Sequence, residues 1–297
     1  MFLPKLPSPI QAFHFPDFEN KNQLQFFVKR DDLIDDLVSG NKWRKLKFNL
    51  KQFHASDKKS IVTFGGAFSN HLLATAAACN LENIDCYGIV RGEELNIKSN
   101  STLSKCDELG MKLIFTTRTL YKEKNTKDIL SKANLNFTDF FEIPEGGANR
   151  LGAKGCEEII TENENFEYDT VACACGTATT LAGIINAVKP STKVLGIAVL
   201  KGENYHHNLL KTYQKDFNLD FEGKDYQIID DYHFGAYAKT NNVLMDFKEK
   251  FELNNGFQLD NIYTAKLFYG IWDLARRGKF KSKSKILLIH TGGLRSF

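Results

Sequence analysis

The chain has 297 residues, of which 42% are hydrophobic and 25% charged, a composition typical of one or two folded domains rather than of disorder or a fibrous repeat. Its 39 basic and 36 acidic residues leave a net charge of +3, which indicates no broad surface for nucleic acid or an anionic membrane. The N-terminal stretch MFLPKLPSPIQAF has no apolar run of signal-peptide length, and no segment approaches a membrane span. We therefore expect a cytoplasmic protein that binds neither nucleic acid nor membrane.

Short β-rich runs alternate with amphipathic stretches along the chain. The predicted strands are, in order, 61–66, 84–92, 111–117, 139–147, 170–176, 192–200 and 285–293. Helical patterns follow several of these strands, and one precedes the last strand, at 70–81, 97–110, 150–163, 179–188 and 263–278. Parallel strands need crossover connections, which helices supply, so the alternation predicts an α/β fold with parallel sheets covered on both faces.

Glycine-rich turns follow four of the predicted strands, in FGGAFSNH, PEGGANRLGAKG, ACGTATT and HTGGLRSF. Loops at the carboxyl ends of parallel strands line the ligand crevice, so these turns predict one shared pocket. The third turn offers small residues, hydroxyls and a helix N-terminus, which suit a phosphate monoester, at Gly176, Thr177, Ala178, Thr179 and Thr180. A plain strand–helix turn with threonine caps is the alternative interpretation.

Two nucleotide sites are disfavoured by residue spacing. GGANRLGAKG has alanine between its last-but-one glycine and the lysine, and no Ser or Thr follows, so it is not an ATP-binding P-loop. No GxGxxG turn with a correctly spaced acidic residue follows a strand, which disfavours a dinucleotide. The phosphate, if one binds, belongs to a smaller molecule.

The six cysteines are too few and too widely spaced for a disulfide scaffold, so they predict reduced thiols. Cys173 and Cys175 could offer two thiolates to a metal. Residues two apart on a strand share one face, however, and no second Cys or His pair at ligand spacing accompanies them. We expect core packing and no metal site, with a metal or redox centre as the alternative.

Lys42 follows Gly-Asn where an extended segment gives way to a helical pattern, in SGNKWRKL. A lysine attacks a carbonyl only when its pKa, about 10.4 in water, is suppressed or its charge is removed by imine formation. An isolated lysine is far more often a surface charge. A pocket that also holds a phosphate makes the carbonyl of pyridoxal phosphate the natural candidate.

The motifs KRDDL, SGNKWRKL, TFGGAFSNH, PEGGANRLGAKG, the threonine-rich loop, YTAK and HTGG occur in this order from one end of the chain to the other. Together they resemble the pyridoxal-phosphate-dependent family of D-cysteine desulfhydrases and 1-aminocyclopropane-1-carboxylate (ACC) deaminases. The resemblance implies fold type II, the tryptophan-synthase-β-like fold, with two open twisted, mostly parallel sheets flanked by helices. It also implies a large cofactor-binding domain of residues 1–45 and 150–297, a small domain of residues 46–149, and a homodimer.

Roles carry over from the family position by position. The resemblance makes Lys42 the lysine of the internal aldimine and Asn70 the partner of the cofactor's phenolic oxygen, and it assigns the phosphate to Gly176–Thr180. The substrate carboxylate would bind at the start of a helix, at Ser69, Asn70 and His71, where a simple helix cap is the alternative. Two tyrosines would face the substrate, although isolated aromatics are more often core, and they complete a catalytic set of Lys42, Ser69, Tyr237 and Tyr263.

Two threonines separate the activities of this family. The deaminases carry Glu and Leu where this chain has Thr264 and Thr291, as the desulfhydrases do. A carboxylate beside the pyridine nitrogen keeps the ring protonated and a strong electron sink, whereas a hydroxyl gives a weaker sink that suffices for a good leaving group. We therefore expect β-elimination from a small amino acid, with D-cysteine as the best candidate, giving a 2-oxo acid, ammonia and sulfide. ACC deamination is one alternative, and a non-catalytic binder of a phosphate ligand or an amino acid is another.

Overall fold

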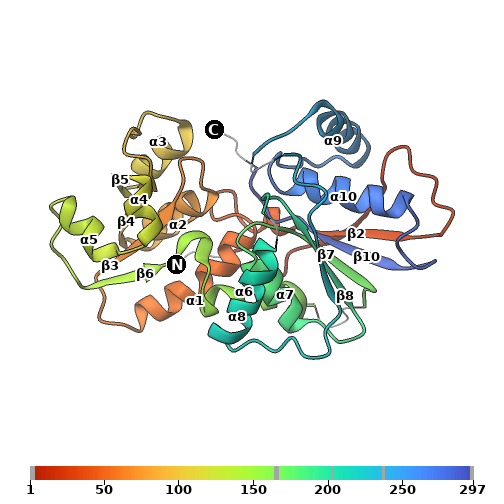
Figure 1. The fold of residues 1–297 in the computed structure, drawn as a ribbon, viewed down its shortest axis with the longest axis horizontal. Helices are drawn as coiled ribbons and strands as arrows, with labels where there is room; N and C mark the ends of the chain where they lie inside the picture. The colour runs from red at the N-terminus through yellow and green to blue at the C-terminus, as the bar shows by residue number, and fades with distance from the viewer. Residues whose placement is uncertain (1–3, 164–166, 203, 236–237, 295–297) are drawn as a thin grey trace.

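The structure is a computed structural model that describes residues 4–163, 167–202, 204–235 and 238–294. The strands of these residues form two sheets, which occupy the right and left halves of Figure 1. The larger has the order β1-β2-β10-β7-β8-β9, from Ile10–Phe13, Gln25–Lys29, Lys285–Ile289, Thr170–Cys175, Lys193–Ala198 and Tyr226–Ile229. The smaller has the order β5-β4-β3-β6, from Lys112–Thr116, Asp85–Arg91, Ser60–Gly65 and Phe140–Ile143.

All neighbouring strands are parallel except the antiparallel β1–β2 pair, so the predicted α/β class with mostly parallel sheets is confirmed. Helices connect the strands. Those of the first half are α1 (Asn41–His54), α2 (Asn70–Glu82), α3 (Ser101–Glu108), α4 (Arg118–Glu123) and α5 (Thr126–Lys132). Those of the second half are α6 (Arg150–Thr161), α7 (Thr179–Ala187), α8 (Tyr205–Asp216), α9 (Asn242–Asn255) and α10 (Thr264–Arg276). Short 3₁₀ turns lie at Asp31–Leu33 and Glu145–Gly147.

The larger sheet is covered on both faces, with α9 and α10 on one side and α6, α7 and α8 on the other. Strand β7, TVACAC, is buried throughout because it lies inside the sheet between the two helical layers. Cys173 and Cys175 point to the α6–α7 side and pack in that core. In the described part of the chain, no group of three or more His, Cys, Asp or Glu side chains is arranged to hold a metal ion.

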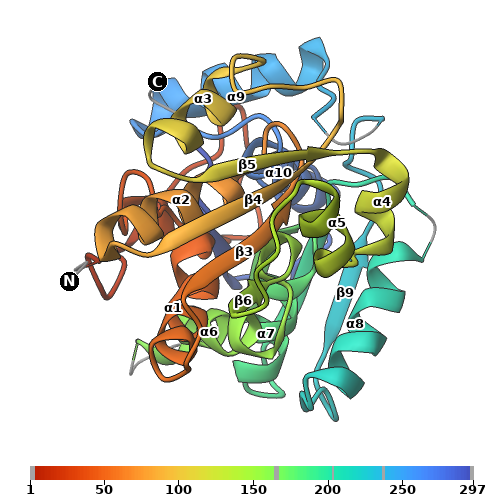
Figure 2. The ribbon, with the colours of Figure 1, turned by 90° about the vertical axis from the view of Figure 1, so that its left-hand side faces the viewer.

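The smaller sheet packs α1, α2 and α3 on one face and α4 and α5 on the other (Figure 2). Its strands all come from residues 60–143, whereas those of the larger sheet come from both ends of the chain. This arrangement agrees with the expected two-sheet architecture. The exact domain boundaries after residues 45 and 149 stay a prediction.

Glycines bring α1 close to α6 and α6 close to α7. A Cβ on Gly155 would lie 1.8 Å from the carbonyl oxygen of Arg44, and one on Gly183 would lie 2.4 Å from the carbonyl oxygen of Ala153. Only residues without a side chain permit backbones to approach so closely. The contact fixes the start of α1 beside the start of α7, which places Lys42 next to the threonine-rich loop.

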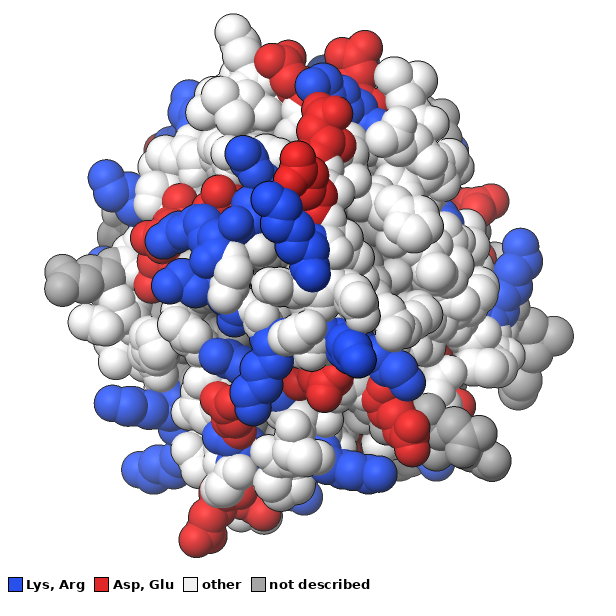
Figure 3. Space-filling model, turned by 90° about the vertical axis from the view of Figure 1, so that its right-hand side faces the viewer, with Lys and Arg blue, Asp and Glu red and all other residues white. Residues whose placement is uncertain are grey.

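Charged side chains of both signs are mixed on the surface. On the face shown in Figure 3, Lys and Arg side chains are interspersed with Asp and Glu and do not form one large basic patch. None of the helices in the described ranges has the length and apolar content needed to cross a membrane.

Candidate active site

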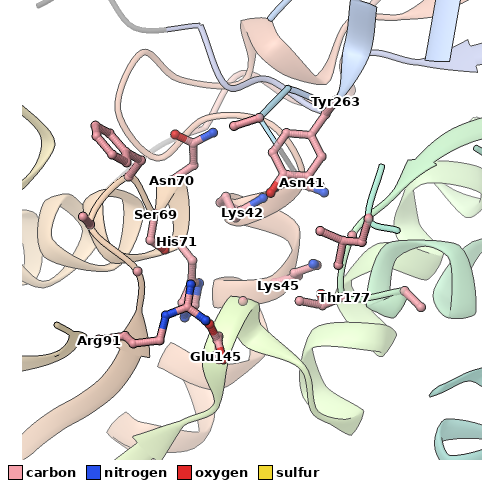
Figure 4. A pocket seen from close by; sticks show the side chains of 18 of the residues that line it. Asn41, Lys42, Lys45, Ser69, Asn70, His71, Arg91, Glu145, Thr177 and Tyr263 are labelled. Atoms are coloured by element: carbon pink, nitrogen blue, oxygen red, sulfur yellow. Dashed lines mark hydrogen bonds between the residues drawn. The ribbon is translucent and has the colours of Figure 1, made fainter. Parts of the chain in front are cut away.

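A cavity of ≈ 1030 Å³ is lined by loops and helix starts from both sheets (Figure 4). Most of the predicted site residues line it: Lys42, Ser69, Asn70, His71, Gly176, Thr177, Ala178, Thr180, Tyr263 and Thr291. Thr179 and Thr264 are fully buried and are not among the lining residues. Tyr237 lies outside the described residues. Four glycine-rich turns predicted one shared pocket, and residues from all four meet in this cavity.

The start of α1 is held by a contact that requires glycine. Gly40 has φ +62°, and a Cβ there would lie 2.0 Å from the carbonyl oxygen of Thr291. The backbone N–H of Asn41 donates to that same carbonyl at 3.3 Å. The C-terminal loop and the N-terminus of α1 therefore form one wall, and Lys42, the second residue of the helix, projects from it into the cavity (Figure 4).

The surroundings of Lys42 lower the pKa of its side-chain amine. Burial away from water, reinforced by the positive charge of Lys45, lowers the pKa of Lys42 from 10.5 to about 7, although Asp260 acts in the opposite direction. The Lys42 Nζ donates to the side-chain oxygen of Asn41 at 2.7 Å, and the side-chain Nδ2 of Asn41 donates to the Thr180 hydroxyl at 2.9 Å. A substantial fraction of this amine is neutral near pH 7, so it can act as a nucleophile and as a base.

The lowered pKa of Lys42 predicts a specific pH profile for cofactor capture. In protein stripped of cofactor, the rate of covalent attachment of pyridoxal phosphate should rise with pH up to about 7 and then level off, because the neutral amine is the reactive form. An Nα-acetyl-lysine amide under the same conditions is the control, and its rate should keep rising towards its ordinary pKa of about 10.4. Stopped-flow absorbance with borohydride trapping measures both. A protein profile that coincides with that of the free amine would refute the electrostatic argument.

The threonine-rich loop links β7 to α7 and presents polar groups to the cavity. Ala178 is the N-cap of α7, with φ +56° and no side chain that could cap the helix, so amides of the first helical turn are left for another acceptor. The Tyr213 hydroxyl donates to the Thr177 carbonyl at 2.9 Å and supports the loop from behind. Small side chains, donating amides and the helix dipole fit a phosphate group. The loop's Gly176 also faces Tyr263, since a Cβ there would lie 3.1 Å from the tyrosine ring.

The start of α2 lies across the cavity from this loop (Figure 4). Ser69 is the N-cap, and its hydroxyl accepts from the Leu72 amide at 3.2 Å while keeping its own proton to donate. The helix-cap interpretation of this motif is therefore correct, and it is compatible with an anion-binding role because other first-turn amides point outwards. An amino-acid carboxylate fits this position.

His71 lines the cavity as a buried, neutral ring. The Thr63 hydroxyl donates to the Ile143 carbonyl at 2.8 Å, so the His71 Nε2, 2.9 Å from that hydroxyl, must donate to it. Burial, together with the positive charges of Lys42 and Lys45, lowers the pKa of His71 to about 3. The ring therefore carries no charge at neutral pH and leaves a buried Nδ1 lone pair without a partner in the described residues.

The two threonines occupy different surroundings. The Thr264 hydroxyl donates to Asp260 Oδ2 at 2.6 Å and accepts from the Asp260 amide at 2.7 Å, so it is fully used at the start of α10. Thr291 lines the cavity, and its hydroxyl forms no hydrogen bond with another described residue. Of the two, Thr291 is the one free to contact a ligand.

Three residues near Lys42 are not identified from sequence: Asn41, Lys45 and Asp260. Lys45 lies one helical turn beyond Lys42 and lines the cavity, and burial lowers its pKa. The three-residue spacing in KWRK places both lysines on one face of a helix, which is a signal that could have found it. Asn41 acts through its contact with Thr180, far away in sequence, which no local pattern indicates. Asp260 accepts from the amides of Ile262, Tyr263 and Thr264, a local turn pattern ahead of α10 that could have indicated it.

The site has the parts needed for a phosphorylated aldehyde attached to a lysine. It offers a lysine with a pKa of about 7, an uncapped helix start beside Thr177 for a phosphate, a second helix start at Ser69 for a carboxylate, and a free hydroxyl at Thr291. The fold and the site thus define an enzyme that processes amino acids with a carbonyl cofactor.

Comparison with known proteins gives the particular family. The profile described as "Pyridoxal-phosphate dependent enzyme" matches residues 4–292. The chain belongs to this family, and its cofactor is pyridoxal 5′-phosphate. A Pyrococcus horikoshii protein provisionally named 1-aminocyclopropane-1-carboxylate deaminase is 30% identical over 97% of this chain and 89% of its own length. The bifunctional D-cysteine desulfhydrase/ACC deaminase of Arabidopsis thaliana mitochondria is 29% identical over 98% of this chain and 77% of its own length.

Solved structures confirm the expected fold type. An ACC deaminase homologue has a TM-score of 0.80 at 27% identity, covering 99% of this chain and 91% of that one. The processed threonine deaminase isoform 2 of Solanum lycopersicum has a TM-score of 0.67 at 17% identity, covering 99% of this chain and 86% of that one, and it shows the shared fold alone. The predicted pyridoxal-phosphate fold type II and the predicted family are both confirmed.

Proposed function

We propose that this enzyme catalyses β-elimination from a small amino acid, with D-cysteine as the best candidate substrate. The observation that carries the proposal is the position of Lys42, whose amine has a pKa of about 7 and lies between the phosphate-binding loop and the start of α2. When bound, pyridoxal phosphate supplies an electron sink for the substrate's α-carbon. The remaining chemistry belongs to side chains of this chain.

The residues divide into binding and proton-transfer groups. Ser69 and the first-turn amides of α2 bind the substrate carboxylate, and Asn70 orients the cofactor from the same helix start. The Lys42 Nζ removes the α-proton as general base, and Tyr263, whose ring centroid lies 5.9 Å from that Nζ, packs beside the reacting atoms. The Cβ–S bond then breaks, its electron pair leaves with the thiolate, and one water releases the nitrogen as ammonia and leaves a 2-oxo acid.

The environment of the threonines favours elimination over ring opening. Thr291 would offer a neutral hydroxyl to the cofactor, and Thr264 would add no charge because its hydroxyl is held by Asp260. A hydroxyl partner makes a weaker electron sink than a carboxylate partner would. ACC deamination is the second candidate, because relatives carry that name and the Arabidopsis protein carries both names.

The test is a substrate panel with cofactor-loaded protein. D-cysteine, L-cysteine, D-serine and ACC are incubated separately, and 2-oxo acid, ammonia and sulfide are measured. We expect D-cysteine to give the three products in equal amounts and ACC to react slowly or not at all. Brisk consumption of ACC with D-cysteine untouched would show that the threonine argument is wrong. Ligand-induced stabilisation without any product would favour the non-catalytic binder instead.

Two further properties are part of the proposal. We infer a homodimer from the family resemblance, which light scattering of the purified protein would test. We infer a cytoplasmic location because all six cysteines are buried and free, as expected in a reducing compartment. Fractionation of cells that express the protein would test that location.

A further inference from the structure

The cavity continues well beyond the groups that a small amino acid and the cofactor require. Its volume of ≈ 1030 Å³ is at the upper end of the range of about 300–1,000 Å³ for small-molecule sites. The additional part is lined by side chains of the smaller sheet and its connections: Arg91, Glu94, Arg118, Tyr121, Lys124 and Glu145. We call this part of the cavity the distal subsite.

Strand topology explains why these residues meet. Strands β4 and β5 are parallel and end side by side, with Arg91 paired in register with Thr116. Thr117 caps α4 directly after β5, and Tyr121 follows on that short helix. The carboxyl ends of parallel strands face the ligand crevice, so the guanidinium of Arg91 and the face of Tyr121 are delivered to the same wall.

Charge pairing in the distal subsite is incomplete. Arg118 pairs with Glu94 at 2.5 Å, and Lys124 pairs with Glu145 at 2.8 Å, so both carboxylates already have a cationic partner. The Arg91 side chain, which is exposed at the mouth of the cavity, makes neither an ion pair nor a hydrogen bond with any described residue, and its guanidinium carbon lies 5.8 Å from the Tyr121 ring centroid. Figure 4 shows the Arg91 side chain directed towards the cavity.

Tyr121 supplies a second donor whose hydrogen bonding is incomplete. Its side chain is only 3% exposed, and its buried hydroxyl makes no hydrogen bond of normal geometry with a described residue. The ring is held by the Lys124 ammonium, 3.4 Å from its centroid, and by Phe64 at its edge. Burial, reinforced by the charge of Glu145 and by a weak hydrogen-bond interaction with its carboxylate, raises the pKa of Tyr121 above its ordinary value, so the group remains a neutral O–H donor. An unsatisfied buried donor is costly unless a ligand accepts from it.

We propose that the distal subsite binds an oxyanion at the end of the substrate's side chain, with Arg91 and Tyr121 as its donors. The substrate class is an amino acid whose β-substituent ends in a carboxylate or a phosphate. A guanidinium presents paired N–H groups that match such an oxyanion, and the Tyr121 hydroxyl adds a third donor. Ala67 and Phe68 line the wall as well and offer apolar surface to the intervening carbon atoms.

This proposal rests on the proposed function, because it assumes an amino acid at the Lys42 centre. It adds the identity of the leaving part of the substrate. D-cysteine would fill only the inner part of the cavity and would leave Arg91 and the Tyr121 hydroxyl without an acceptor on the ligand. We therefore expect D-cysteine to be turned over, as proposed above, but to bind more weakly than an extended amino acid with an anionic end.

Matched ligands test the proposal with cofactor-loaded protein. S-carboxymethylcysteine and S-carbamoylmethylcysteine differ only in the charge at the end of the side chain, and O-phosphoserine and O-methylserine form the phosphate arm. Both enantiomers of each are titrated, and Kd is read from the cofactor's visible spectrum. We expect the anionic member of at least one pair to bind about tenfold more tightly or better, the gain typical of a charged hydrogen-bonded pair.

Variants assign that preference to the distal subsite. In Arg91→Gln the ratio of the two Kd values should fall to near one, and in Tyr121→Phe it should fall about threefold or more. Lys127→Gln removes an equal charge from an exposed position on α5 that does not line the cavity, and it should keep the wild-type ratio. Cofactor content and melting temperature of each variant establish that it is folded.

The outcomes separate this inference from the proposed function. Equal affinities within both ligand pairs, in a protein that binds the cofactor and consumes D-cysteine, would overturn the distal subsite alone. A preference that Arg91→Gln leaves intact would overturn it as well. A protein that takes up no cofactor and responds to no amino acid would overturn the proposed function, and the distal subsite with it.

Discussion

Replacing Lys42 with alanine should abolish covalent cofactor attachment and reduce turnover by about a thousandfold or more. The amine is both the attachment point and the proposed base, and general base catalysis alone is typically worth about 10²–10⁴ in rate. Loss of both roles leaves only binding. After borohydride reduction, mass spectrometry of the wild type should place the cofactor on the peptide that contains Lys42, and the variant should show no adduct on any lysine.

A neighbouring lysine makes this prediction specific. Lys45 also lines the cavity, and its pKa is also lowered by burial, so it is the competing nucleophile. Lys47 is on the same helix but pairs with Glu158 at 2.7 Å outside the cavity, and Lys47→Ala should keep colour and activity. An adduct on Lys45 in the wild type, or full activity in Lys42→Ala, would show that the reactive lysine has been assigned to the wrong residue.

Much of the fold follows from local sequence, and the exceptions have physical causes. Interior strands such as β7 and β10 are apolar runs because helices cover both their faces, and that pattern is visible in the sequence. Strands β1 and β9 are four-residue edge strands, and β2 next to β1 has five residues, so none of them is predicted. A strand of that length gives few alternations, so it stands out only where apolar residues and a following turn mark it, as they do for β6, a four-residue edge strand that is predicted. The predicted helix at 97–110 begins only at Ser101, because Asn100 caps it by accepting from the Leu103 amide.

Some residues of the candidate site are likewise indicated by local sequence, whereas others are brought together only by the fold. Lys42, Ser69 and the threonine-rich loop belong to contiguous motifs, so the sequence indicates them directly. The partner of Thr264 is Asp260, only four residues earlier, so this pair too is local in sequence. Arg91 and Tyr121 belong to neighbouring strands and a short helix, and they meet only because β4 and β5 end together. Functional groups that depend on topology, rather than on a motif, require the structure.

Replacing Arg44 with methionine should destabilise the fold by about 3–5 kcal/mol, the usual cost of breaking a buried ion pair on one side. The Arg44 guanidinium has no exposure and pairs with Asp31 at 2.8 Å and with Glu162 at 2.5 Å. Lys29, also fully buried, pairs with the same Glu162. Loss of Arg44 leaves two carboxylates facing one buried lysine. The midpoint of thermal unfolding, measured by circular dichroism, should fall markedly.

Lys47→Met is the matched control, because it removes a cation from the same helix at a partly exposed pair with Glu158. Its cost should be below about 1 kcal/mol. Adding Glu162→Gln to Arg44→Met should recover part of the loss, since one uncompensated charge is then removed and coupled residues are not additive. We call the buried ion pairs of Arg44, Asp31, Glu162 and Lys29 the buried network. Equal losses of stability for Arg44→Met and Lys47→Met would contradict it. So would an Arg44→Met/Glu162→Gln variant whose loss equals the sum of the two single losses.

Acid stability gives the same network a second signature. Burial opposes ionisation of Glu162, but hydrogen bonds and charges from Arg44 and Lys29 outweigh it and lower the pKa of Glu162 to about 2. The stabilisation from this carboxylate is therefore present above its unfolded pKa of about 4.3, and it is lost as the pH falls through about 2. Without the guanidinium the folded pKa of Glu162 rises towards its unfolded value, so the pH window in which protonation of Glu162 costs stability becomes narrower. Arg44→Met, already less stable at neutral pH, should therefore lose less additional stability between about pH 4 and pH 2 than the wild type. Lys47→Met should follow the wild-type acid profile, because Glu158 is partly exposed and lies outside this buried cluster.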